Sequence, residues 1–154
     1  FDGDGRDEVG VGARHTDDVR DDVELWVFTP AESSDTPTFK ITEGEDAQLA
    51  EYTCTDVDGD GRADILMQRP KEENEVAYEV GAVHLFFGGI TGTRSEDSAD
   101  RVFMSNPVNN FFGTVVTTGD HDDDGYNDLI IGGRFSDISA FSSEAWLSEW
   151  WDLD

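Results

Sequence analysis

The feature that most constrains this 154-residue sequence is an acidic, glycine-bearing segment that occurs three times. The copies begin at Phe1, Val57 and His121, and a short run of apolar, mostly β-branched residues follows each one directly. Internal similarity of this kind is typical of repeat proteins, in which each unit buries an apolar face against the next. We therefore predict a single repeat region, 1–154, with a partial repeat at 1–48, a complete repeat at 49–108 and a partial repeat at 109–154.

The apolar runs of the complete repeat predict strands. Runs rich in β-branched and aromatic residues, bounded by glycine and aspartate, indicate four of them, at 49–55, 64–69, 78–87 and 102–105. The acidic segment lies between the first two strands, and Gly88, Gly89 and Gly92 mark a turn before the fourth. The segment 144–153 fits both strand and helical spacing, and its register with the other copies favours a strand. The expected fold is all-β, with one four-stranded antiparallel sheet per repeat.

Two of the acidic segments carry carboxylates at positions one, three, five and nine and a glycine at position six. In loop 2 (56–64) the carboxylates belong to Asp56, Asp58, Asp60 and Asp64, and in loop 3 (120–128) to Asp120, Asp122, Asp124 and Asp128. A tightly curved loop turns alternate side chains toward one centre, where a hard dication accepts six to eight oxygens. The backbone carbonyls of Arg62 and Tyr126, at position seven, would add a ligand to each loop. An all-oxygen set without His or Cys favours Ca²⁺ over zinc or copper, and crowded carboxylates suit Ca²⁺ better than Mg²⁺.

The first acidic segment, loop 1 (1–8), matches the other two only in part. Asp2, Asp4 and Glu8 correspond to positions three, five and nine, and position one falls before residue 1. An EF-hand is excluded for the complete loops, because position twelve holds Met67 or Ile131 in place of the bidentate glutamate and the flanks are strand-like.

The charge balance excludes nucleic acid as a partner. Asp and Glu number 36 against ten Lys and Arg, a formal net charge of -26, whereas a phosphate-binding surface needs a basic face. The single cysteine cannot form an internal disulfide or a cysteine zinc site. No apolar run approaches the roughly 20 residues of a membrane span, so we expect none in this fragment.

With the loops placed between strands, the sequence resembles the FG-GAP repeat of integrin α-subunit propellers. The matching residues are Phe112-Gly113 leading into loop 3, the stretch 128–133 after it, and 81–88, which is similar to the third-strand motif of the family. The resemblance implies a secreted or cell-surface β-propeller for adhesion, with one calcium ion per blade held by the acids of the loops. Because closed propellers have about four to eight blades, it also implies that other blades, from a longer chain or an assembly, complete this fragment of about two and a half repeats.

The expected function is that of an extracellular module that binds a protein or glycan ligand on a propeller face, with Ca²⁺ in a structural role. One alternative is a lectin-like propeller using exposed aromatic side chains, for which the candidates are Trp26, Phe111, Trp146, Trp150 and Trp151. The other is a fragment of a calcium-dependent enzyme acting on polysaccharides. None of the three histidines lies in a recognisable catalytic motif, and GxSxG and HExxH are absent from the sequence. We therefore expect no enzyme, no catalytic residue and no organic cofactor.

Overall fold

The computed structural model describes residues 3, 5–17, 20–28, 36–43, 51–69, 81–104, 111–133 and 145–148, with the backbone alone at 14–17, 20–22 and 145–148. The strands are β1 (Val9–Asp17), β2 (Arg20–Phe28), β3 (Phe39–Thr42), β4 (Glu51–Thr55), β5 (Asp64–Arg69), β6 (Ala82–Phe86), β7 (Gly92–Ser95), β8 (Arg101–Met104), β9 (Val115–Gly119), β10 (Asp128–Gly132) and β11 (Ala145–Ser148). A 3₁₀ turn, η1 (Glu96–Ser98), lies between β7 and β8. The all-β class predicted from the sequence is confirmed.

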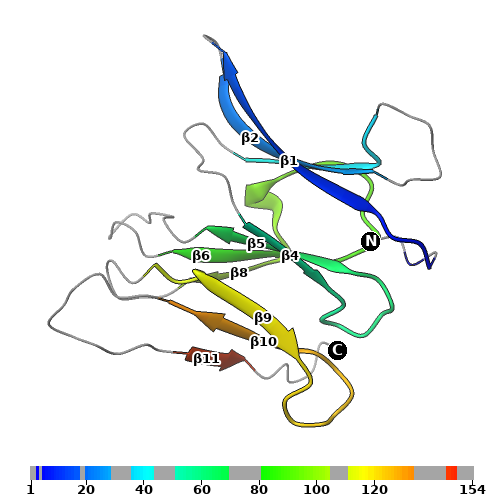
Figure 1. Ribbon diagram of the computed structural model, residues 1–154, viewed down its shortest axis with the longest axis vertical. Coiled ribbons are helices and arrows are strands. Elements are labelled where there is room, and N and C mark those ends of the chain that lie inside the picture. The colour runs from blue at the N-terminus through cyan, green and yellow to red at the C-terminus, as the bar shows by residue number, and fades with distance from the viewer. Residues whose placement is uncertain are drawn as a thin grey trace, which may run out of the picture.

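The strands form three sheets that lie face to face as successive layers (Figure 1). Their strand orders are β1-β2-β3-β7, β4-β5-β6-β8 and β11-β10-β9. The middle sheet is the four-stranded antiparallel sheet that the sequence predicts, in the predicted chain order. The arrangement is consistent with incomplete blades of a propeller, in which neighbouring sheets share apolar cores.

The two central strands of the middle sheet, β5 and β6, are buried on both faces because a core lies on each side of them. Every residue of β6 is buried, and so are 64–68 of β5. Neighbouring side chains along β5 point to opposite faces: Ile65 and Met67 pack against β2 and β3, whereas Leu66 packs with Leu129 and Ile131 of β10. This explains why the strand is a continuous apolar run instead of an alternating one.

The four predicted strands of the complete repeat correspond to β4, β5, β6 and β8, with β6 shorter than predicted at both ends of its described part and β8 beginning one residue earlier. The predicted third strand began at 78, and residues 70–80 lie outside the described part of the chain. β11 confirms a strand at 145–148, within the segment whose spacing also fitted a helix. The rest of that segment, and with it Trp150 and Trp151, lies outside the described residues.

One expectation was wrong: Gly92 does not end a simple turn between the third and fourth strands. It begins β7, which leaves the middle repeat and pairs in parallel with β3 of the first sheet, with Phe39 opposite Gly92 and Thr42 opposite Ser95. The first sheet therefore contains one parallel pair. Only a partner distant in the sequence satisfies the backbone groups of β7, which is why local residue patterns gave no sign of it.

Side chains fasten this crossing segment to the middle sheet. Arg94 of β7 forms two contacts with the Asp100 carboxylate, at 2.9 Å and 3.2 Å, and its guanidinium lies 5.2 Å from the centre of the Phe86 ring. These contacts hold β7 against the middle sheet, just before the chain enters β8.

A half-buried polar cluster around the buried Glu43 joins the first two sheets near the same segment. The Glu43 carboxylate, which follows β3, accepts a hydrogen bond from the Tyr52 hydroxyl of β4 and pairs with Arg69 of β5 at 3.4 Å. Arg69 also pairs with Glu96 of η1. Burial raises the pKa of Glu43, and the Tyr52 hydrogen bond and the Arg69 charge partly offset that effect. The cluster therefore links the two sheets, although burial removes the Glu43 carboxylate from water.

The second and third sheets meet backbone to backbone. Gly81, which precedes β6, lies so close to residue 112 that a Cβ there would fall 2.6 Å from the Phe112 nitrogen and closer still to the Phe112 oxygen. Conversely, a Cβ on Gly113 would lie 2.9 Å from the Ala82 oxygen. The Phe112-Gly113 motif of one repeat thus packs against Gly81-Ala82 of the repeat before it. Both motifs require glycine for space as well as for a positive φ.

Candidate metal loops

Loop 2 is a compact loop between β4 and β5 whose carboxylates accept hydrogen bonds from its own backbone. Asp56 Oδ1 accepts from the amides of Gly59 (2.7 Å) and Asp60 (3.1 Å), and its Oδ2 accepts from Gly61 (2.9 Å). Asp64, fully buried at the start of β5, accepts from Val57 N at 2.8 Å. The first and last acids therefore hold the loop in its curved form. The positive φ values of Gly59 (75°) and Gly61 (85°) permit the tight turns between them.

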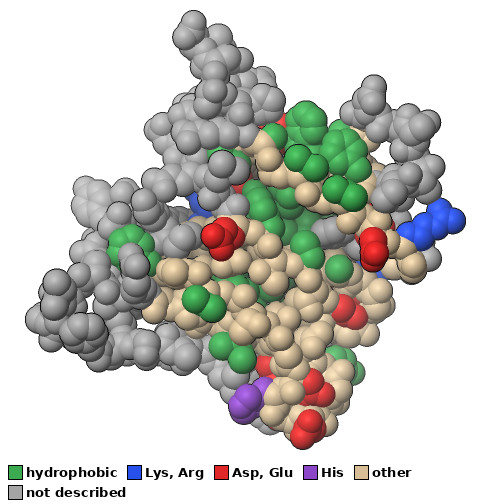
Figure 2. Space-filling view, in the orientation of Figure 1, with side chains coloured by type: hydrophobic (Ala, Val, Ile, Leu, Met, Phe, Trp, Pro, Cys, Tyr) green, Lys and Arg blue, Asp and Glu red, His purple; other side chains and the backbone are tan. Residues whose placement is uncertain are grey.

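Loop 3, between β9 and β10, repeats these contacts at equivalent positions. Asp120 accepts from the amides of Asp124 (3.0 Å) and Gly125 (2.9 Å), as Asp56 does from positions five and six of loop 2. Asp128 accepts from His121 N at 2.7 Å, as Asp64 does from Val57 N. Loops 2 and 3 and the described residues of loop 1 lie at the same end of their sheets (Figure 1). Figure 2 shows acidic side chains exposed at the lower end of the molecule, where loop 3 lies.

The structure brings together three of the four predicted carboxylates in each complete loop, but not the same three. Carboxylate oxygens of Asp56, Asp58 and Asp64 lie within 4.8 Å of one another in loop 2, as do those of Asp120, Asp122 and Asp124 in loop 3. Asp60 instead lies near the Arg62 guanidinium, at 3.7 Å, and accepts the amide of Arg62. Asp128 is buried and bonded to His121. Because Ca²⁺ lies about 2.3–2.6 Å from its ligand oxygens, two ligands on opposite sides of one ion are about 5 Å apart. Both groups fit such an ion.

Electrostatic repulsion and burial act on these carboxylates together. Burial raises the pKa of Asp64 to about 6, against the opposing effect of the amides of Val57 and Gly88 that donate to it. The pKa values of Asp58 and Asp122 are also raised. Loss of solvation is the larger cause, and the negative charge of the neighbouring carboxylates adds to it. A bound cation would relieve this crowding, since it favours the charged form of every carboxylate beside it.

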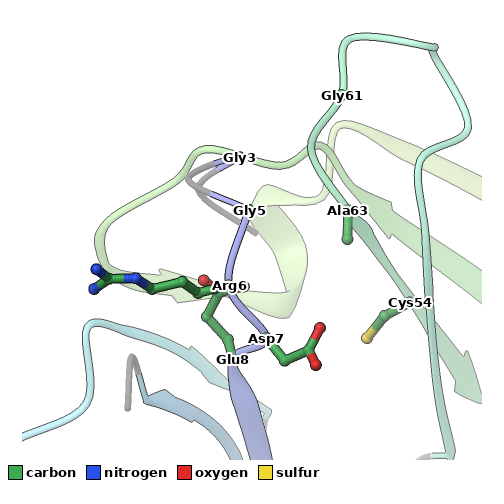
Figure 3. A pocket seen from close by; sticks show the side chains of 8 residues that line it. All are labelled: Gly3, Gly5, Arg6, Asp7, Glu8, Cys54, Gly61 and Ala63. Atoms are coloured by element: carbon green, nitrogen blue, oxygen red, sulfur yellow. The ribbon is translucent and has the colours of Figure 1, made fainter. Parts of the chain in front are cut away.

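Loop 1 faces loop 2 across a cavity of about 520 Å³ (Figure 3). Residues of both loops and of β4 line it: Gly3, Gly5, Arg6, Asp7, Glu8, Cys54, Gly61 and Ala63. The Asp7 and Cys54 side chains point into the gap, and the Arg6 side chain points away from it. Of the predicted loop 1 ligands, Glu8 lies among the cavity residues, whereas Asp2 and Asp4 lie outside the described part of the chain.

The position-seven residues were predicted to act through their carbonyls. Their side chains also contact glycines outside their own loops. The Arg62 side chain lies against the backbone of Gly88 and Gly89, and the Tyr126 ring lies against Gly59 of loop 2. Sequence reasoning missed Gly88, whose amide donates to Asp64 at 2.7 Å, and Asn127, whose amide group reaches loop 2. The repeated loop spacing did not indicate them, because each acts on a residue outside its own loop.

No family model matches the chain. Curated proteins do match it: integrin α-PS3 of Drosophila melanogaster is 30% identical over 106 residues, 64% of this chain and 9% of that protein. Integrin α-PS5 of the same species is 32% identical over 99 residues, which is 60% of this chain and 10% of that protein. Integrin α pat-2 of Caenorhabditis briggsae is 27% identical over 153 residues, 88% of this chain and 12% of that protein.

The repeat region is integrin-α-like. The resemblance predicted from the loops and the Phe-Gly motif is confirmed by these relatives. This integrin-α-like chain spans about a tenth of the length of the curated relatives it matches. Within the described residues, no helix has the length and apolar character needed to cross a membrane.

Proposed function

We propose that this chain is part of a calcium-stabilised β-propeller that acts in adhesion or ligand binding outside the cell. The observation that carries the proposal is the repetition of one loop structure at one edge of successive sheets. Loops 2 and 3 share ligand spacing, backbone hydrogen bonds and a cluster of three carboxylates within 4.8 Å. Turns that are only solvated share no requirement that would preserve all three features.

Calcium would act here as a structural ion. The ligands proposed are Asp56, Asp58, Asp60, Asp64 and the Arg62 carbonyl in loop 2, Asp120, Asp122, Asp124, Asp128 and the Tyr126 carbonyl in loop 3, and Asp2, Asp4 and Glu8 in loop 1. Filling a loop offsets the repulsion among its acids and ties the two strands that flank it. Extracellular calcium modules bind with dissociation constants of about 10⁻⁴ to 10⁻³ M, which suits an ion that is always present outside the cell.

The adhesive role follows from the similarity to integrin α subunits. The proposed partners are a protein or glycan ligand, met by the face of the completed propeller, and the remaining blades that pair with the outer sheets.

No observation favours the lectin or enzyme alternatives. Trp26, one of the lectin candidates, is half-buried and donates its indole N–H to Glu24 at 2.7 Å. Its ring is therefore held in the sheet. The relatives named above are integrin α subunits and lend the enzyme alternative no support.

The proposal is tested by calorimetric titration of the chelator-treated 154-residue chain with calcium, followed by thermal melts with and without the ion. We expect two or more calcium equivalents and a raised melting temperature. Binding to the native state alone stabilises by about 2.7 kcal/mol per site when the free ion is at one hundred times its dissociation constant. Absence of binding heat together with an unchanged melt would refute the metal role of the loops.

Two loop variants and one control distinguish calcium binding in the loops from a general effect of net charge. Asp58→Asn and Asp122→Asn each remove one negative charge from a proposed site and should each abolish or weaken one equivalent. Asp97→Asn removes one charge from an exposed residue of η1 and should leave both equivalents in place. Equal losses in all three variants would mean that calcium responds to net charge alone.

A further inference from the structure

Neighbouring loops touch through the same two positions at both interfaces between repeats. The side chain at position seven of one loop lies over the glycine at position four of the loop before it. Arg62 Cγ lies 3.0 Å from the place a Cβ would take on Gly3, and Tyr126 Cε1 lies 2.5 Å from the equivalent place on Gly59. Both glycines have a positive φ, 78° and 75°. The recurrence of this contact with two different side chains indicates a feature of the loop geometry itself.

A second contact joins loop 3 to loop 2. The Asn127 side chain, at position eight, donates from Nδ2 to the backbone carbonyl of Asp56 at 2.9 Å. Beside it, Thr118 Oγ1 of β9 lies 3.3 Å from Thr55 Oγ1 of β4. The amide group of Asn127 therefore holds the peptide that directly follows the position-one aspartate of the neighbouring loop.

We propose that loops 2 and 3 bind divalent cations cooperatively, with Tyr126 and Asn127 of loop 3 acting as positioning residues for loop 2. The proposal rests on the proposed function, that each loop holds a calcium ion. It adds that the two sites are one coupled unit and that the side chains coupling them contribute no ligand atom themselves.

The coupling arises because an ion in loop 3 also orders part of the loop 2 backbone. A cation in loop 3 would fix the backbone of Tyr126, whose carbonyl is a proposed ligand, and with it the adjoining Asn127. The Tyr126 ring and the Asn127 amide then hold Gly59 and Asp56 in the form that loop 2 needs. Ordering already achieved by the first ion lowers the entropic cost of binding the second. Linkage makes the effect reciprocal, so an ion in loop 2 tightens loop 3 by the same factor.

One effect opposes the coupling. The first cation cancels negative charge that would attract the second, so charge alone predicts weaker binding at the second site. Salt screens this effect of the first cation's charge on the second, with a screening length of about 8 Å at 0.15 M ionic strength. A contact between a side chain and the backbone does not depend on salt in this way. The sign of the measured coupling at that salt concentration therefore separates the two mechanisms.

The test is a set of calcium titrations by calorimetry on the full chain, with loop 1 silenced throughout by Asp2→Asn and Asp4→Asn. Loop 2 alone is measured after Asp122→Asn and Asp124→Asn, and loop 3 alone after Asp58→Asn and Asp60→Asn. The coupling factor is the product of the two single-site dissociation constants divided by the product of the two stepwise constants of the two-site protein. We expect a factor of about five or more, the lower range of allosteric couplings.

Two further variants assign the coupling to its side chains. Asn127→Ala should lower the factor toward one, because it removes the donor to Asp56, changes no proposed ligand and leaves only the Tyr126 contact with Gly59. His121→Ala, an exposed side chain in the same loop, should leave the factor unchanged. A coupling factor near one in the protein with Asn127 intact, with two ions still bound, would overturn the proposal and leave the proposed function standing. A factor that Asn127→Ala leaves unchanged would also overturn it, and failure of every loop to bind calcium would remove both.

Discussion

Replacing Gly81 by alanine tests whether the Phe-Gly and Gly-Ala motifs hold neighbouring repeats together. Gly81 has a φ of 76°, and a Cβ there would lie 2.6 Å from the Phe112 nitrogen. The obstructing atoms belong to backbone, which cannot rotate away as the end of a flexible side chain can. We expect the third sheet to be pushed from the second, with loss of packing around Phe112.

The magnitude follows from two separate costs. An L-residue in the left-handed region costs about 1–2 kcal/mol, and forcing extra volume into a packed site costs about 1–3 kcal/mol. Gly81→Ala should therefore lower the free energy of unfolding by about 2–5 kcal/mol. At about 2–4 °C per kcal/mol for a chain of this size, the melting temperature should fall by about 4–20 °C.

Gly92→Ala is the matched control, because Gly92 has a φ of 82° and no heavy atom within 4 Å of its Cβ position. It should show only the conformational cost of about 1–2 kcal/mol. Urea and thermal unfolding of both variants against the unsubstituted chain measure the difference. Equal destabilisation of the two variants would refute the conclusion that Gly81 is required for space.

Three further outcomes are expected from other parts of the fold. Phe112→Ala should lower the free energy of unfolding by about 3–5 kcal/mol, whereas Val115→Ala, which is 58% exposed, should change it by about 0.5 kcal/mol or less in urea melts. Glu43 has a raised pKa, so its contribution to stability is present below its ordinary value of 4.5 and is lost as pH rises through the folded value. Stability of chelator-treated protein should thus fall less between about pH 4.5 and 7 in Glu43→Gln than in the unsubstituted chain, and identical slopes would contradict the burial effect. Arg94→Ala should cost about 1–3 kcal/mol through the lost Asp100 contacts, as measured by thermal melts. An unchanged melting temperature would mean that these contacts do not stabilise the attachment of β7 to the middle sheet.

The parts of the fold that were predicted correctly are those specified by neighbouring residues. β4, β5 and β6 fall within the predicted segments and β8 begins one residue before its own, because apolar runs bounded by glycine and aspartate act locally. The curved loops were also expected, since the hydrogen bonds from Gly61 to Asp56 and from Gly125 to Asp120 close within one motif. The assignment of individual calcium ligands stays a prediction.

Other features were beyond sequence reasoning because their partners are distant in the chain. β7 looks like part of a turn until β3 is placed beside it, and parallel pairing leaves no signal in a four-residue strand. The buried Asp64 accepts the amide of Gly88, 24 positions along the chain, and the contact of Asn127 with loop 2 depends on how two sheets stack.

The sequence alone therefore determined the all-β class, the repeat and the shape of each acidic loop, because these follow from periodicity, turn residues and hydrogen bonds over a few positions. Only the tertiary structure decided which strand closes which sheet, which glycines must remain glycine for space, and how one loop touches the next. The physical reason is that these contacts join residues tens of positions apart, whose proximity exists only after the sheets have packed face to face.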